Sequence, residues 1–144
     1  MRYWLCGFLG LLAGSTWAEV IFEDIQGHQR SFSSMKGSWV FVNYWAPWCQ
    51  ACLDEIPTLN RFSQKHKSVF LFAVNYDAPP KTEQGSLVKD LGMQYPSLSA
   101  DPALALGLGD IAALPATFVF NPKGQWVDTL YGEQTLKTLE RALD

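Results

Sequence analysis

Apolar and β-branched residues gather in short runs that polar segments separate. The run at 39–45 reads WVFVNYW, and the run at 69–74 reads VFLFAV. Near-continuous runs of this length are typical of strands that are buried on both faces of a sheet. Four shorter strands are expected, paired as two hairpins: 20–22 with 30–32, and 117–120 with 126–131.

Helical patterns fill most of the chain between and after these strands. Apolar residues recur at helical spacing from 49 to 66, and Pro57 should kink this helix because proline lacks a backbone donor. Three further helices are expected, at 84–91, 101–108 and 135–143. Asp101 is placed to cap the second of them. Strands that alternate with helices predict an α/β fold with a central mixed sheet and helices on both faces.

The first eighteen residues differ in character from the rest. MRYWLCGFLGLLAGSTWA has a basic residue at Arg2, an uncharged run, and small residues at −3 and −1 before Glu19. This is the layout of a secretory signal peptide, and the run is shorter than the roughly 20 residues of a membrane-spanning helix. We therefore divide the chain into a cleaved signal peptide at 1–18 and one domain at 19–144. A retained membrane anchor is the alternative.

Cleavage would change both the charge and the cysteine count. It removes Arg2 and Cys6, so the formal net charge moves from −3 to −4 and Cys49 and Cys52 remain as a single pair. Disulfides form and persist in exported proteins. A mildly acidic chain without a cluster of Lys and Arg lacks the charge of a nucleic-acid-binding protein, so no nucleic-acid partner is expected.

Cys49 and Cys52 stand two residues apart at the start of the expected helix. A structural zinc site needs four ligands, and the chain offers His66 as a third but no residue in place for a fourth. A purely structural disulfide would close too short a loop to stabilise the fold much. A helix N-terminus stabilises a thiolate, so the spacing favours a redox dithiol in which Cys49 attacks and Cys52 resolves. This chemistry needs no cofactor and no metal.

Three segments carry a resemblance to a known family: FVNYWAPWCQACLDEIP, ALPATFVF and FEDIQGHQRSFSSMKGSWV. Together they resemble exported thioredoxin-fold proteins of the TlpA/ResA/DsbE type, over about residues 20–143. The resemblance implies a thioredoxin fold with an added N-terminal β-hairpin. It also implies that Pro115 is a cis-proline facing the dithiol, which turns the Leu114 backbone toward a bound substrate strand.

The resemblance also bears on the proton that the resolving thiol must lose. Asn43 stands where cytoplasmic thioredoxins have a buried aspartate, and asparagine cannot take a proton. The acidic residue of the resembled branch lies three positions after the second cysteine, which is Glu55 here. The alternative for Glu55 is a solvated glutamate in the first turns of the helix. Trp48, directly before Cys49, is expected to be a partly exposed lid on the sulfurs and an apolar platform for substrate.

These features predict a periplasmic thiol–disulfide oxidoreductase that reduces disulfides in exported proteins and takes electrons from a membrane thiol donor. One task known in the resembled family is to keep the Cys-x-x-Cys-His segment of apocytochrome c reduced. We expect the domain to be a monomer. The alternatives are a disulfide-introducing oxidase, a non-catalytic binding module, and a peroxidase, which would want threonine or serine in place of Ala46.

Overall fold

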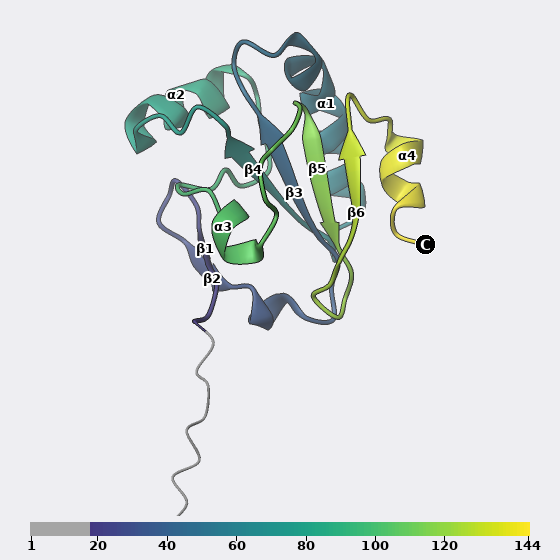
Figure 1. Ribbon diagram of the computed structural model, residues 1–144. Helices are drawn as coiled ribbons and strands as arrows, with labels where there is room; N and C mark the ends of the chain where they lie inside the picture. Colours follow the sequence, from purple (N-terminus) through teal and green to yellow (C-terminus); the bar gives the residue numbers. More distant parts are fainter. Residues whose placement is uncertain (1–17) are drawn as a thin grey trace, which may run out of the picture.

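A four-stranded mixed sheet forms the centre of the molecule, in the strand order β4-β3-β5-β6 (Figure 1). Its strands are β3 (Val40–Trp45), β4 (Phe70–Asn75), β5 (Ala116–Phe120) and β6 (Trp126–Tyr131). β3 and β4 run parallel, and the other two neighbouring pairs are antiparallel. The computed structural model describes residues 18–144, so the expected signal peptide lies outside the described residues, apart from Ala18.

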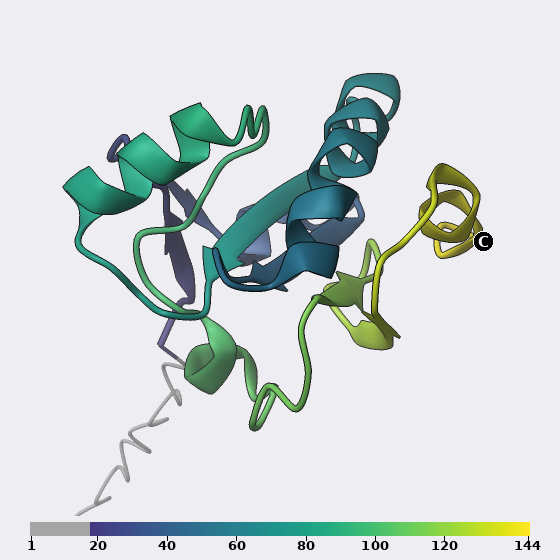
Figure 2. The same cartoon turned by 90° about the horizontal axis from the view of Figure 1, so that it is seen from above.

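Helices and a small second sheet cover the two faces of the central sheet (Figures 1 and 2). The helices are α1 (Gln50–Lys65), α2 (Lys81–Asp90), α3 (Ala103–Leu106) and α4 (Leu136–Arg141), with a 3-10 turn η1 (Ser33–Met35). The second sheet is the antiparallel hairpin of β1 (Ile21–Glu23) and β2 (Gln29–Ser31). α1 and α4 lie on one face, and the hairpin, η1 and α3 lie on the other. The expected architecture, a central mixed sheet flanked by helices with an added N-terminal hairpin, is therefore confirmed.

β3 is buried along its whole length because its alternate side chains enter two different cores. Phe41 and Trp45 pack with Phe62 and the rest of the α1 face. Val42 and Tyr44 pack on the opposite face, against the hairpin and α3. The expectation of a strand buried on both faces is confirmed, and this strand leads directly to the cysteine pair.

Two helices begin two or more residues away from the expected start. α2 starts at Lys81 instead of 84. The start was missed because the buried residue of its first turn is the polar Gln84, whose Nε2 donates to the Leu98 carbonyl at 2.9 Å. A first turn whose buried residue is polar adds nothing to the apolar periodicity that Leu87 and Val88 give further along. α3 starts at Ala103 with Pro102 at the N-cap. Asp101 still supplies the capping acceptor, since its Oδ1 accepts from the Ala103 N–H at 2.8 Å.

A short extended segment, residues 96–99, ties the N-terminal hairpin to the central sheet. On one side, the Ala73 N–H of β4 donates to the Pro96 carbonyl and the Leu98 N–H donates to the Ala73 carbonyl, both at 2.8 Å. On the other side, the Ser99 N–H donates to the Glu23 carbonyl of β1 at 2.8 Å. The hairpin is thus joined to β4 through backbone hydrogen bonds on both sides of this segment.

Candidate active site

The central sheet delivers the two cysteines to the start of α1. β3 ends at Trp45, a short turn follows, and Cys49 is the N-cap residue of α1. Its backbone is extended, with φ of −94° and ψ of 100°, and its Sγ accepts a hydrogen bond from the Cys52 N–H at 3.2 Å. Because the first N–H groups of a helix lack partners within the helix, a sulfur at this place faces donors that stabilise negative charge.

Cys49 and Cys52 are joined by a disulfide, with 5.2 Å between their Cα atoms. The two residues differ in environment. Cys49 is 9% exposed, whereas Cys52 is 2% exposed and packs in the core with Ile56 and Leu59. The outer sulfur is therefore nearer to solvent than the inner one, as a division into attacking and resolving sulfurs needs. His66, the third ligand of the zinc alternative, instead contacts Glu140, with 2.9 Å from Nε2 to Oε1.

Glu55 lies one helical turn after Cys52 and is completely buried. Its Oε1 accepts a hydrogen bond from Asn43 Nδ2 at 2.8 Å, and its Oε2 accepts one from the Gln134 N–H at 2.7 Å. The solvated alternative for this glutamate is therefore wrong. A buried carboxylate without hydrogen bonds would cost several kcal/mol, and these two donors offset part of that cost.

The two donors to Glu55 come from elements that lie far apart in the sequence. Asn43 is in β3, opposite Thr117 of β5, and its Nδ2 also donates to Thr117 Oγ1 at 3.0 Å. The Gln134 N–H lies in the turn between β6 and α4. This turn begins at Gly132, which has φ of +81° and donates its N–H to the Pro115 carbonyl at 2.9 Å. The carboxylate thus links the sheet, α1 and the segment before α4.

Burial raises the pKa of Glu55 from 4.5 to about 7. The hydrogen bonds from Gln134 and Asn43 lower it and offset part of this effect, while the nearby charge of Glu133 raises it further. A carboxyl group with a pKa near neutrality can both accept and release a proton at physiological pH. Glu55 therefore has the acid–base property that Asn43 lacks.

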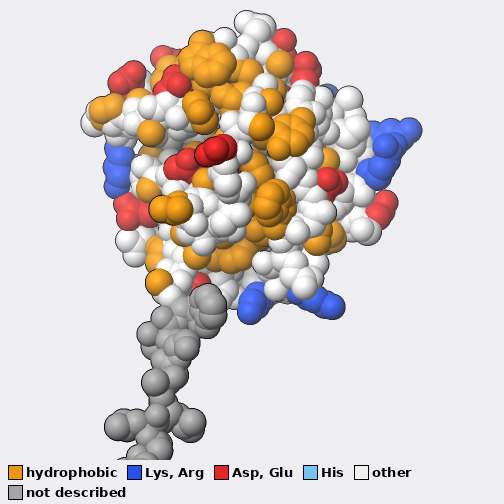
Figure 3. Space-filling model, viewed as in Figure 1, with side chains coloured by type: hydrophobic (Ala, Val, Ile, Leu, Met, Phe, Trp, Pro, Cys, Tyr) orange, Lys and Arg blue, Asp and Glu red, His pale blue; other side chains and the backbone are white. Residues whose placement is uncertain are grey.

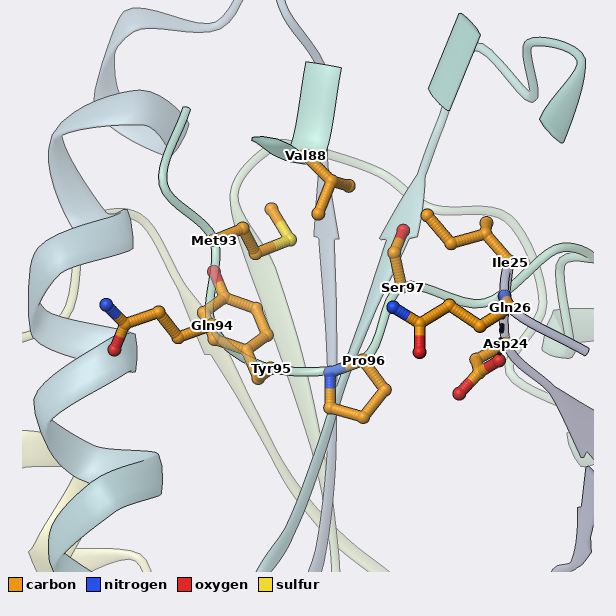
Figure 4. Close-up of a pocket in the computed structure, with 9 residues that line it drawn as sticks. All are labelled: Asp24, Ile25, Gln26, Val88, Met93, Gln94, Tyr95, Pro96 and Ser97. Atoms are coloured by element: carbon orange, nitrogen blue, oxygen red, sulfur yellow. Dashed lines mark hydrogen bonds between the residues drawn. The ribbon is translucent and has the colours of Figure 1, made fainter. Parts of the chain in front are cut away.

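Tyr95 lies in the same core as Cys52, and its hydroxyl is buried without a hydrogen-bond partner among the described residues. Burial, and to a smaller extent the charge of Glu55, raise the pKa of Tyr95. Its ring also lines a cavity of about 240 Å³ (Figure 4). Figure 4 shows two opposite sides of this cavity, formed by Met93, Gln94 and Tyr95 and by Asp24, Ile25 and Gln26. The residues expected at the redox site do not line it, so we assign the cavity no part in the reaction.

The Leu114–Pro115 peptide bond is cis, as the resemblance implies. Pro115 is buried directly before β5, and Leu114 is partly buried and packs against the core that includes Cys49 and Cys52. Leu114 also packs against the second core, on the opposite face of the sheet, so it lies between the two cores.

Trp48 is 67% exposed, and its Nε1 donates to both carboxylate oxygens of Asp77, at 3.0 and 3.1 Å.

Sequence reasoning missed Asp77, Tyr95 and the donor role of Asn43. A polar residue inside the apolar run of β3 was the available signal for Asn43. Asp77 gave no signal, because an aspartate in a polar loop is common.

Comparison with known proteins identifies the family of this chain and several relatives with a named activity. The model of the AhpC/TSA family matches residues 14–127. The thiol-disulfide oxidoreductase ResA of Bacillus subtilis (strain 168) is 32% identical over 124 residues, which cover 85% of this chain and 69% of that protein. ResA of Geobacillus kaustophilus (strain HTA426) is 29% identical over 133 residues, which cover 91% of this chain and 76% of that protein.

The crystal structure of StoA from Bacillus subtilis matches with a TM-score of 0.72, over 91% of this chain and 100% of that chain. At 23% identity, this likeness shows the thioredoxin fold alone. Together with the relatives, it confirms the resemblance to the TlpA/ResA/DsbE type.

The raised pKa of Glu55 predicts how stability depends on pH. The folded protein holds this proton more tightly than the unfolded chain, so the free energy of unfolding contributed by Glu55 should fall as pH rises from 4.5 to about 7. The fall should be at most about 3 kcal/mol. Urea unfolding of the oxidised protein and of Glu55→Gln at several pH values measures it, because the other titrating groups are common to both proteins. A constant difference between the two proteins across this range would contradict the prediction.

Proposed function

Because this chain belongs to the AhpC/TSA family and is a thiol–disulfide oxidoreductase of the ResA type, we propose that it is exported and reduces disulfides in other exported proteins. One arrangement carries the proposal: a redox pair at the N-terminus of α1, followed one turn later by the buried carboxylate of Glu55. The first feature favours a reactive thiolate at Cys49, and the second offers an acceptor for the proton of Cys52.

In the first step, the Cys49 thiolate attacks one sulfur of the substrate disulfide. The substrate S–S bond breaks, a mixed disulfide forms at Cys49, and the other substrate sulfur leaves as a thiolate that takes up a proton. The N-cap position supports this role, because the Cys49 Sγ already accepts the Cys52 N–H hydrogen bond and faces the helix N-terminus.

In the second step, Cys52 loses its proton and attacks the Cys49 Sγ. The mixed disulfide breaks, the second substrate sulfur leaves as a thiolate, and the enzyme disulfide forms. Two electrons have then passed from the cysteine pair to the substrate. Since Cys52 is buried, its thiolate is disfavoured unless an acceptor takes the proton. Glu55, one helical turn after Cys52 and with a pKa of about 7, can take it directly or through one water.

The surroundings of Cys52 support work as a reductant. A pair becomes strongly oxidising when its reduced form is stabilised, as by a stable thiolate. Burial of Cys52 and a carboxylate one turn away both disfavour negative charge on its sulfur. Cys52 therefore adds no thiolate stabilisation to that of the helix N-terminus at Cys49, and this fits a pair less oxidising than one in which both sulfurs are stabilised as thiolates.

Substrate binding is assigned to Leu114, Pro115 and Trp48. Leu114 is partly buried against the core that includes the pair, and the resemblance implies that its backbone adds a substrate strand by main-chain hydrogen bonds. The exposed indole of Trp48 adds an apolar platform directly before Cys49. An extended polypeptide that carries a disulfide fits these elements, and we include the Cys-x-x-Cys-His segment of apocytochrome c in this class.

Export rests on the signal-like segment at 1–18, and a membrane thiol donor would restore the dithiol outside the reducing cytosol. In residues 18–144, no helix has both the length and the apolar character needed to cross a membrane. The amino terminus of protein recovered from cells tests whether the segment is removed before Glu19.

Replacing each cysteine in turn tests the assigned roles. Cys49→Ser should abolish reduction of a disulfide-bonded protein, because the attacking sulfur is lost. Cys52→Ser should instead accumulate mixed disulfides through Cys49, because the resolving step is lost. Non-reducing electrophoresis and mass spectrometry of the trapped species measure both outcomes. Mixed disulfides in Cys49→Ser, formed through Cys52, would reverse the assignment.

The reduction potential of the pair tests the direction of electron flow. We expect a value nearer that of thioredoxin, about −270 mV, than that of the oxidant DsbA, about −120 mV. Equilibration with glutathione or dithiothreitol buffers, followed by thiol alkylation, gives the value. A potential near that of DsbA would favour the disulfide-introducing oxidase.

The proton role of Glu55 predicts a kinetic defect in Glu55→Gln. The variant keeps size and polarity but cannot accept the Cys52 proton, so release of the mixed disulfide should slow by roughly 10²-fold or less. Asp54→Asn is the matched control, because Asp54 is the preceding residue of α1 and is exposed. Stopped-flow measurement of the rate of substrate release from pH 6 to 8 compares both variants with the wild type. An unchanged rate in Glu55→Gln would mean that water, and not Glu55, accepts the Cys52 proton.

A further inference from the structure

Trp48 is an exposed side chain that is nevertheless held in place. Its indole N–H donates to both oxygens of the Asp77 carboxylate, at 3.0 and 3.1 Å. Hydrogen bonds with one ionised partner are shorter and stronger than neutral ones. An indole that is 67% exposed would otherwise sample several rotamers, so this bond restricts Trp48 to one orientation beside Cys49.

Asp77 is fixed in turn by the loop that follows β4. Its N–H donates to the Asn75 Oδ1 at 3.0 Å, and the preceding Tyr76 N–H donates to the Trp45 carbonyl at 2.8 Å. Ala78 has φ of +48°, a left-handed conformation that is uncommon for alanine, and its N–H donates to the Asn75 carbonyl at 3.0 Å. Such a conformation persists where the surrounding structure determines it.

The bond between Trp48 and Asp77 therefore joins two loops, one after β3 and one after β4. These strands are parallel neighbours, so both loops leave the same end of the sheet. In Figure 3, which shares the view of Figure 1, hydrophobic side chains are exposed at this upper end and across the middle of the face, with Asp and Glu beside them, whereas Lys and Arg lie at the lower end and the sides. The exposed rings of Trp48 and Tyr76 add apolar surface to these two loops.

We propose that Asp77 is a positioning residue for substrate: it holds Trp48 as a rigid apolar platform for the polypeptide whose disulfide meets Cys49. This inference rests on the proposed function, in which Trp48 contacts the substrate. A platform that is already ordered loses less conformational entropy when substrate binds, so Asp77 should affect the affinity for substrate and not the chemical step. Asp77 does not touch the reacting sulfurs, and a disulfide too small to reach the indole gains nothing from it.

A double-mutant cycle separates this role from a general effect of charge or folding. Wild type, Asp77→Ala, Trp48→Phe and the double variant are compared with a disulfide-bonded protein and with a small organic disulfide. Asp77→Ala should raise KM for the protein substrate about three- to tenfold, the size of the entropy cost of ordering one side chain on binding, with kcat unchanged. It should leave the small disulfide unaffected. In the Trp48→Phe background, which has no indole N–H, Asp77→Ala should have no further effect.

Asp110→Ala is the matched control, because it removes one exposed carboxylate from another loop and should leave KM unchanged. Thermal unfolding of each variant reports folding. An equal rise in KM with and without the indole would show that Asp77 acts through its charge, and an unchanged KM would show that it does not act on substrate; either result overturns the inference. The outcome is independent of the cysteine test: trapping by Cys52→Ser would still support the proposed function if Asp77 had no effect.

Discussion

One buried carboxyl group constrains the interior of this protein. Glu55 has no exposed surface, so each of its oxygens needs a donor from the protein. One donor is Asn43 of β3 and the other is the backbone of Gln134, which the turn at Gly132 brings back over α1. A chain that failed to place any of these elements would leave a carboxylate without partners in an apolar core. The strand, the helix and the segment before α4 must therefore be positioned together.

Within one turn, helix α1 places two sulfurs in environments that have opposite effects on their charge. At its N-terminus, unpaired N–H groups and the helix dipole favour negative charge on the Cys49 sulfur. One turn further in, Cys52 lies in an apolar core that favours the neutral thiol. The two sulfurs are chemically identical, so their difference comes from depth along the helix alone. A buried carboxyl group that titrates near neutrality then fits beside the inner sulfur, where a proton has to be moved.

The sequence predicted what depends on local pattern. The runs at β3 and β4, the turn before β6 and the Cys49/Cys52 spacing were sufficient for the strand order in sequence, the fold class and the redox pair. The surroundings of Glu55 could not be derived in the same way, because its partners lie 12 and 79 positions away. The start of α2 was missed because the buried residue of its first turn, Gln84, is polar. The bond from Trp48 to Asp77 was missed because it joins two polar loop positions that come together only in the folded chain.

The attachment of the N-terminal hairpin has a consequence for how this fold can diverge. Residues 96–99 hold the hairpin to β4 through peptide groups, which every residue carries whatever its side chain, and Pro96 takes part through its carbonyl, the only backbone hydrogen-bonding group that a proline has. Exposed side chains of the hairpin are therefore free to change over evolutionary time while the hairpin stays attached. Relatives could differ widely in the surface they present at this edge and still keep the same distance between that surface and the redox pair.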